Sequence, residues 1–149
     1  MLISCRNELR ITFTLRVILL RNVDDYDKIV LVINLSENVL LKYSEQLAIE
    51  IELLCKEIKA NSNAIFQLRK SSSSVFANIT EAQYPQSLPD MLSKFKIARK
   101  ECNETEAWLK LLFSTNVIDE NIFKKYRNLC GRIKRILTAS CITIENKLK

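Results

Sequence analysis

From residue 36 onward, apolar side chains recur at steps of three and four, the spacing that places them on one face of a helix. Four such segments follow one another, at residues 36–59, 64–83, 88–113 and from residue 120, with short polar connections between them. Short connections make consecutive helices antiparallel. The pattern therefore predicts an all-α protein, an antiparallel up-down four-helix bundle that occupies residues 36–149.

The ends of these segments carry residues that start or stop helices. Ser36 and Asp119 are typical N-cap residues, and Pro85 ends the second segment. Ser87 to Asp90 combine a cap, an early proline and an acid three residues after the cap, which is a typical helix start.

The second segment contains four consecutive serines, Ser71 to Ser74, which at first sight suggest a linker. Ser72, however, falls on the apolar face of the predicted helix, together with Ile65, Leu68, Val75, Ile79 and Ala82. Each serine costs roughly 0.5 kcal/mol of helix propensity against alanine, so packing must hold this helix. The small side chains allow a neighbouring helix to approach closely.

Residues 1–35 follow a different pattern. Apolar residues alternate with Arg and Thr from Leu9 to Leu19, and residues 28–35 are again apolar and β-branched. Residues 22–25 have turn chemistry, so we expect a separate N-terminal appendage, residues 1–35, that forms a β-hairpin. Two isolated strands are marginal in water, and a poorly ordered segment or a start-site artefact are the alternatives.

Composition excludes several classes of function. The chain has no histidine, which dimetal carboxylate bundles and common nucleophile-activating arrangements need. It has a single glycine, Gly131, so a glycine-rich phosphate loop cannot be built. We therefore expect no enzymatic activity, no catalytic residue, no metal and no cofactor. Gly131 lies inside the predicted fourth helix and costs about 1 kcal/mol against alanine, which is tolerable if a neighbouring helix crosses close by.

The five cysteines form no C-x-x-C pair, and Cys55, Cys102 and Cys130 fall on apolar helical faces, as expected of small buried side chains. The longest uncharged apolar run, at residues 29–33, is far shorter than the roughly 20 residues that a membrane span needs. The first residues do not have the pattern of a signal peptide. We expect a cytoplasmic protein with no membrane partner.

Short motifs in the second and third segments occur in a recognisable order. The second contains Lys70, the serines, Ala77-Asn78-Ile79 and Glu81-Ala82. Further motifs are Glu37-Asn38 and Ser44 upstream, then Gln86-Ser87, Asp90, Lys94, Ile97-Ala98, Lys100-Glu101, Glu104-Thr105, Trp108-Leu109 and Leu111-Leu112. The set resembles the four-helix-bundle family of the 23S rRNA intervening-sequence proteins, which is related to retroelement accessory variability proteins. Phe76 and Thr80 depart from the pattern, at a usually small position and a commonly acidic one.

The predicted third helix has a second stripe beside its main apolar face. Its members recur at steps of four and three: Ile97, Glu101, Glu104, Trp108 and Leu111. The stripe is either the rim of a wide buried face or a subunit interface, where Trp is enriched. The resemblance implies a pentameric ring and favours the interface. We expect the two acids to form ion pairs with Arg69, Lys70 or Lys100.

Positive charge gathers near the C-terminus. The chain has a net charge of +6, and residues 121–149 hold eight Lys or Arg against one acid, Glu145. The cluster on the side opposite the apolar face is Lys124, Lys125, Arg127, Arg132, Lys134 and Arg135. It is either a solvated face or a surface that binds the phosphate backbone of nucleic acid, which needs no base-specific geometry.

Two functions from different classes remain open. The first is a non-enzymatic homo-oligomer, a pentamer by the resemblance, that binds structured RNA or DNA through these basic residues. The second is a protein-interaction or accessory module without direct nucleic-acid binding. The resemblance implies that some relatives are accessory subunits of reverse transcriptases, so a reverse transcriptase is one example of a protein partner for this chain.

Overall fold

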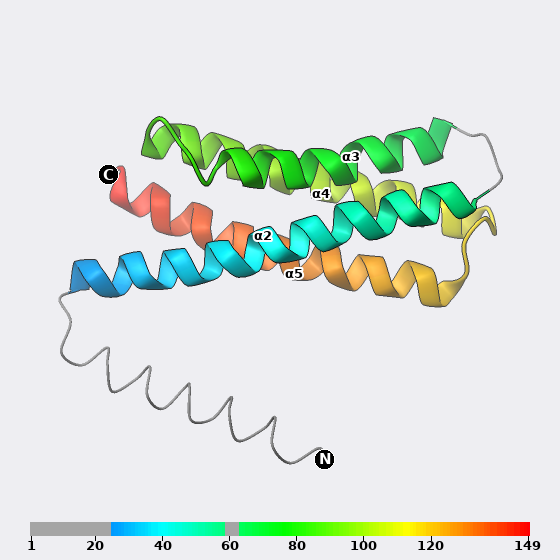
Figure 1. Cartoon of the computed structure of the whole chain (residues 1–149), viewed down its shortest axis with the longest axis horizontal. Coiled ribbons are helices and arrows are strands. Elements are labelled where there is room, and N and C mark those ends of the chain that lie inside the picture. Colours follow the sequence, from blue (N-terminus) through cyan, green and yellow to red (C-terminus); the bar gives the residue numbers. More distant parts are fainter. Residues whose placement is uncertain (1–24, 59–62) are drawn as a thin grey trace, which may run out of the picture. The chain divides into compact units, whose positions relative to one another are not determined.

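The structure, a computed structural model, describes residues 25–58 and 63–149, with side chains from residue 39. Four helices account for most of this part of the chain: α2 (Asp25–Glu57), α3 (Asn63–Glu81), α4 (Leu88–Ser114) and α5 (Glu120–Lys147) (Figure 1). Within the described ranges there is no strand, so the predicted all-α class is confirmed there. The chain divides into the units Met1–Leu35 and Ser36–Lys149, and the second contains α3, α4, α5 and most of α2.

The predicted second strand of the N-terminal hairpin is wrong. Helix α2 begins at Asp25, so residues 28–35 are helical and Ser36 lies inside a helix instead of capping it. A short apolar run fits a buried helix as well as a strand, and no Gly or Pro separates this run from the helical pattern that follows. The predicted first strand, at residues 9–19, lies outside the described residues.

Two of the helix starts have the predicted caps. The Ser87 hydroxyl accepts a hydrogen bond from the backbone N–H of Asp90 at 3.3 Å, with proline in the first turn of α4. The Asp119 carboxylate accepts from the N–H of Ile122 at 2.8 Å and begins α5. Both caps satisfy N–H groups that have no partner inside the helix.

The apolar faces of the four helices meet in one core. The predicted apolar faces of α2, α3 and α4 are buried along most of their length, with Leu40, Ile51, Phe95 and Leu109 among the most enclosed side chains. Ile58 and Met91, at the ends of two of these faces, are only half-buried. The spacing in α5 predicts a buried face of Ile122, Tyr126, Leu129, Ile133, Ile136 and Ser140, and the structure differs from it in the second half. The buried residues there are Leu137, Cys141 and Ile144, whereas Ile136 and Ser140 are half-buried. Both series have helical spacing, so the sequence pattern alone does not choose between them.

Polar contacts join neighbouring helices in opposite residue order. The pairs are Ser71 with Thr105 and Glu81 with Lys94 between α3 and α4, and Lys96 with Glu145 and Glu106 with Lys134 between α4 and α5. As residue numbers rise along one helix of each pair, they fall along the other. This order is the one that antiparallel neighbours produce.

The serines of α3 lie where the close approach was expected. Ser71 and Ser72 are both buried, and the Thr105 hydroxyl of α4 lies 3.0 Å from the Ser71 hydroxyl. The Ser71 and Ser72 hydroxyls also donate to backbone carbonyls one turn earlier, at Leu68 and Arg69. The polar groups of this small-residue contact are therefore satisfied inside the bundle.

Candidate nucleic-acid interface

All six predicted nucleic-acid-binding residues lie on α5, away from its buried face. Five of them are exposed, and Lys134 is half-buried against α4. They are held in place because Tyr126, Leu129 and Ile133 bury the opposite side of the same helix. The structure nevertheless divides the six into two groups with different surroundings.

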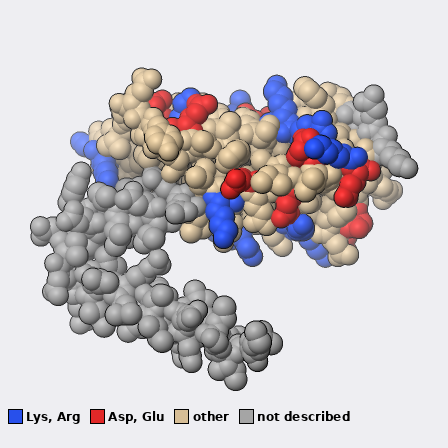
Figure 2. Space-filling model, in the orientation of Figure 1, with Lys and Arg blue, Asp and Glu red and all other residues tan. Residues whose placement is uncertain are grey.

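The three lysines of the cluster lie beside acids. Lys124 pairs with Glu120 at 2.8 Å, Lys125 pairs with Glu50 of α2 at 2.7 Å, and Lys134 pairs with Glu106 of α4 at 2.6 Å; these are nitrogen-to-oxygen distances. Lys134 also donates to Asn103 at 3.2 Å. A neighbouring carboxylate offsets the charge that each lysine would offer to phosphate. On the face shown in Figure 2, Lys and Arg lie interspersed with Asp and Glu.

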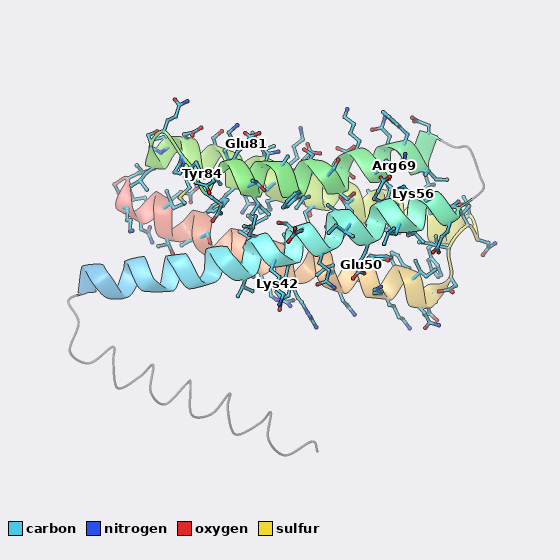
Figure 3. All side chains as sticks on the ribbon, in the orientation of Figure 1. Lys42, Glu50, Lys56, Arg69, Glu81 and Tyr84 are labelled. Carbon is cyan, nitrogen blue, oxygen red and sulfur yellow. The ribbon has the colours of Figure 1, made fainter. Side chains whose placement is uncertain are left out.

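Glu50 lies on α2 (Figure 3), and its ion pair with Lys125 joins α2 to α5. Burial acts to raise the pKa of Glu50, but hydrogen bonds from Lys125 and Gln46 outweigh it, and the pKa lies below its usual value. The hydrogen bond to Glu50 raises the pKa of Lys125. Lys125 therefore has a structural partner in the bundle, which sequence spacing could not reveal.

The three arginines have no acid partner among the described residues. The Arg127 guanidinium lies over the Phe123 ring at 6.0 Å. Arg132 lies over the Tyr43 ring of α2, also at 6.0 Å. An aromatic ring can position a guanidinium without neutralising it. Arg127, Arg132 and Arg135 are therefore the members of the cluster whose charge stays available to an anion.

A hollow of about 560 Å³ lies among these arginines on the surface of α5, where Glu106 of α4 borders it. Its lining consists of Glu106, Arg127, Asn128, Gly131, Arg132, Lys134 and Arg135. Four of its seven lining residues are cationic, and its one acid, Glu106, already pairs with Lys134. The hollow is therefore suited to a small anionic group such as phosphate.

Gly131 stands in this lining, and its environment corrects one expectation. A Cβ at Gly131 would meet only the Arg135 guanidinium, with the nearest nitrogen at 3.9 Å, which is an ordinary contact. No atom of another described helix lies within 4 Å of that Cβ position, so a tight helix contact does not explain the glycine. The absence of a side chain at Gly131 leaves open space between the arginines. The sequence alone did not indicate Asn128 or this hollow. A glycine that weakens a helix and lies among arginines is the signal that could have indicated the hollow.

The second stripe of α4 is only partly covered. Ile97 and Leu111 are 39% and 44% exposed, while Glu101, Glu104 and Trp108 are half-buried. The Trp108 indole N–H donates to the Glu104 carboxylate at 3.1 Å. The ion pairs expected for the two acids do not form within the described residues. Arg69, labelled on α3 in Figure 3, pairs with Glu52 of α2. The Glu104 carboxylate instead accepts the hydrogen bond from the Trp108 indole.

The four cysteines in the described ranges are buried and free, as predicted for Cys55, Cys102 and Cys130. A hydrogen bond with Cys102 and burial raise the pKa of the Cys130 thiol well above its usual value. Such thiols behave as small apolar side chains. In the same ranges, no cluster of cysteine and carboxylate side chains could hold a metal ion. None of the described helices has a stretch sufficiently long and apolar to cross a membrane.

Comparison with known proteins places this bundle in a family. A family model described as 23S rRNA-intervening sequence protein matches residues 36–139. The chain is also similar to the crystal structure of a protein of unknown function from the S23 ribosomal protein family of Bacteroides thetaiotaomicron. The two share 33% sequence identity with a TM-score of 0.68, over 74% of this chain and 98% of that chain. No curated protein sequence matches. The family model spans most of the chain, and the chain belongs to the 23S rRNA-intervening sequence protein family.

Proposed function

We propose that the protein is a non-enzymatic, homo-oligomeric bundle that binds structured RNA or another nucleic acid through α5. The observation that carries the proposal is the hollow bordered by Arg127, Arg132 and Arg135, none of which has an acid partner among the described residues. The proposed unit is an antiparallel up-down four-helix bundle, which the opposite order of the interhelical contacts supports.

Arginine suits this role because its planar guanidinium donates several hydrogen bonds to phosphate and keeps its charge at any physiological pH. Binding of this kind follows the backbone and needs no base-specific contact. Self-association through the α4 stripe would repeat the arginine surface in each subunit. Several weak phosphate contacts would then act together on one RNA.

The absence of histidine supports a non-enzymatic role, because the common ways of activating a nucleophile use histidine as the base. The described thiols are buried, so they do not offer a surface nucleophile. The proposal therefore assigns binding, and no reaction, to α5.

A salt titration on one labelled, structured RNA tests the proposal. Wild type should lose affinity steeply as salt rises, because neutralised phosphates release counterions. Replacing Arg127, Arg132 and Arg135 together by Gln should weaken binding and flatten the slope by roughly one unit for each phosphate that is no longer neutralised. Equal affinities and slopes for the two proteins would contradict the proposal.

A matched control uses three exposed lysines of α3 and α4 that have no acid partner within the described ranges: Lys70, Lys100 and Lys110. Their replacement by Gln removes the same net charge from another surface. If this variant loses as much affinity as the arginine variant, the effect reflects overall charge and α5 is not the binding surface.

A protein-interaction or accessory module is the second candidate. Exposed apolar side chains favour it, since α2 presents Val39, Ile49 and Leu53 at 43%, 53% and 53% exposure. Ile49 and Leu53 are one turn apart on the same face of α2, and contiguous apolar surface is typical of sites that bind another protein. A reverse transcriptase encoded next to the gene, together with equal RNA binding by wild type and the arginine variant, would favour this candidate.

A further inference from the structure

Two hollows on the surface of α5 meet at Gly131. The first is the arginine hollow described above, and the second has a volume of about 420 Å³. Gly131, Lys134 and Arg135 line both. Because these three residues are shared, the two hollows lie next to each other along α5, and we refer to the adjacent pair as the groove and to each hollow as one of its ends.

The second hollow has a different character. Its other lining residues are Thr138, Ala139 and Ile142, and the Ile142 side chain is 53% exposed. One end of the groove therefore presents cationic groups and the other end presents small and apolar side chains. Arg135 stands between them, with one guanidinium nitrogen 3.9 Å from the Cβ position of Gly131.

A ligand that fills both ends needs an anionic group attached to a body that can pack on apolar side chains and on the Arg135 guanidinium. A nucleotide has this form, with phosphate at one end and a base at the other. Guanidinium planes stack on bases, and an Asn side chain such as that of Asn128 can hydrogen-bond a base edge. In a duplex the base is enclosed by pairing and stacking, so only an unpaired nucleotide can reach both ends.

We propose that the groove around Gly131 binds one unpaired nucleotide, with its phosphate between Arg127 and Arg132 and its base against Arg135, Ala139 and Ile142. The proposal rests on the proposed binding of nucleic acid and specifies the form of the strand. Loops, bulges and single-stranded ends are then bound in preference to a regular duplex.

Gly131 is the only glycine of the chain, so protein labelled with ¹⁵N-glycine gives a single backbone amide signal at the centre of the groove. We would titrate the full-length protein with adenosine monophosphate, inorganic phosphate and adenosine. The signal should move saturably with the nucleotide, at a concentration about tenfold lower than with phosphate, because contact with the base adds binding energy. Adenosine should have little effect.

Variants test the same groove with RNA by fluorescence anisotropy, comparing a single strand with a blunt duplex of equal length. Gly131→Glu and Gly131→Gln place side chains of similar size in the groove, and only Glu adds a negative charge. Glu should weaken single-strand binding more than Gln. Arg135→Lys keeps the positive charge but removes the planar guanidinium that stacks on a base. The preference for single strands should therefore fall, while the dependence of RNA affinity on salt concentration stays the same.

Three results would overturn the subsite: no movement of the Gly131 signal with the nucleotide, equal affinities for nucleotide and phosphate, or equal affinities for single strand and duplex. These results are distinct from failure of the proposed function. Salt-dependent RNA binding that depends on the arginines but ignores strand form keeps the proposed function and removes the subsite. If the Gly131 signal shifts saturably with the nucleotide but the protein binds no RNA, the subsite is kept and the proposed function is removed.

Discussion

The basic side chains of α5 differ in what lies next to each of them. Lys125 and Lys134 lie against carboxylates of α2 and α4, whereas Arg127 and Arg132 lie against aromatic rings. The lysine pairs connect helices of the bundle, while the arginines keep their charge on the surface. Charge-reversal of Lys125 would therefore disturb the bundle as well as the surface. Arginine replacements are the cleaner test of binding.

The Glu50–Lys125 pair predicts a pH dependence of stability. The pKa of Glu50 is lower in the folded protein than in the unfolded chain. The ionised Glu50 therefore contributes to the free energy of unfolding at pH values above its pKa in the unfolded chain, and this contribution is lost as the pH falls through its pKa in the folded protein. Below the usual glutamate pKa of 4.5, wild type should therefore lose unfolding free energy more steeply than Glu50→Gln. Urea unfolding of both proteins at several pH values measures the difference.

The exposed Lys96–Glu145 pair provides the control for this prediction. Lys96 also lowers the pKa of Glu145, but both side chains are more than 40% exposed. Exposed pairs contribute little, so Glu145→Gln should change the acid dependence less than Glu50→Gln. If the Glu50 variant has the same acid dependence as wild type, the pair does not stabilise the folded protein.

Among the helices, α3 shows how packing holds a segment of modest helix propensity. Ser71 and Ser72 face the core, while Ser73 is exposed on the same turn. The buried serines matter for their size, because a larger side chain would hold a neighbouring helix away. The exposed serine has no such role.

This difference gives a prediction with a built-in control. Ser72→Leu should lower the free energy of unfolding by about 1–3 kcal/mol, the typical cost of overpacking a filled core. Ser73→Leu should be neutral or slightly stabilising, because leucine has the higher helix propensity. Denaturant unfolding of both variants checks this, and similar losses at the two positions would show that Ser72 does not lie in a tight contact.

Patterns of local spacing predicted most of the helices. Periodicity was enough to predict the buried faces of α3 and α4, and capping chemistry was enough to predict the caps at Ser87 and Asp119. The start of α2 was missed because an apolar run at residues 28–35 satisfies both a strand and a helix. The acid partners of Lys125 and Lys134 are remote in sequence, so no local pattern could show which basic residues are neutralised.

For the molecule as a whole, the α4 stripe leads to a prediction about assembly. We expect a homo-oligomer, with a pentamer as the form implied by the family resemblance. Replacing Ile97 and Leu111 by Glu should reduce the mass measured by light scattering without lowering helix content, because both side chains are exposed in the single chain. Trp108 is a less clean target, since it also packs against the core.

The light-scattering result has two contradicting outcomes. A wild-type monomer at micromolar concentration would remove the assembly proposal. An unchanged oligomer in the Ile97 and Leu111 variant would place the interface elsewhere on the surface, such as the exposed apolar residues of α2.

The division of the chain at residue 36 leads to a further prediction. A fragment of residues 36–149 should fold and unfold cooperatively, because it contains every described core residue from Leu40 to Ile144. Circular dichroism during thermal unfolding measures this. A fragment without a cooperative transition would show that residues before 36 belong to the folding unit.

Cross-linking would show whether α5 is the surface that meets nucleic acid. Structured RNA containing 4-thiouridine would be irradiated with the wild-type protein, and the linked peptides would be identified by mass spectrometry. We predict that cross-links gather in Glu120–Lys147, close to Arg127, Gly131 and Arg135, and weaken as salt rises. Cross-links concentrated on α2 or α3, or none above those of an unrelated basic protein, would contradict the assignment of binding to α5.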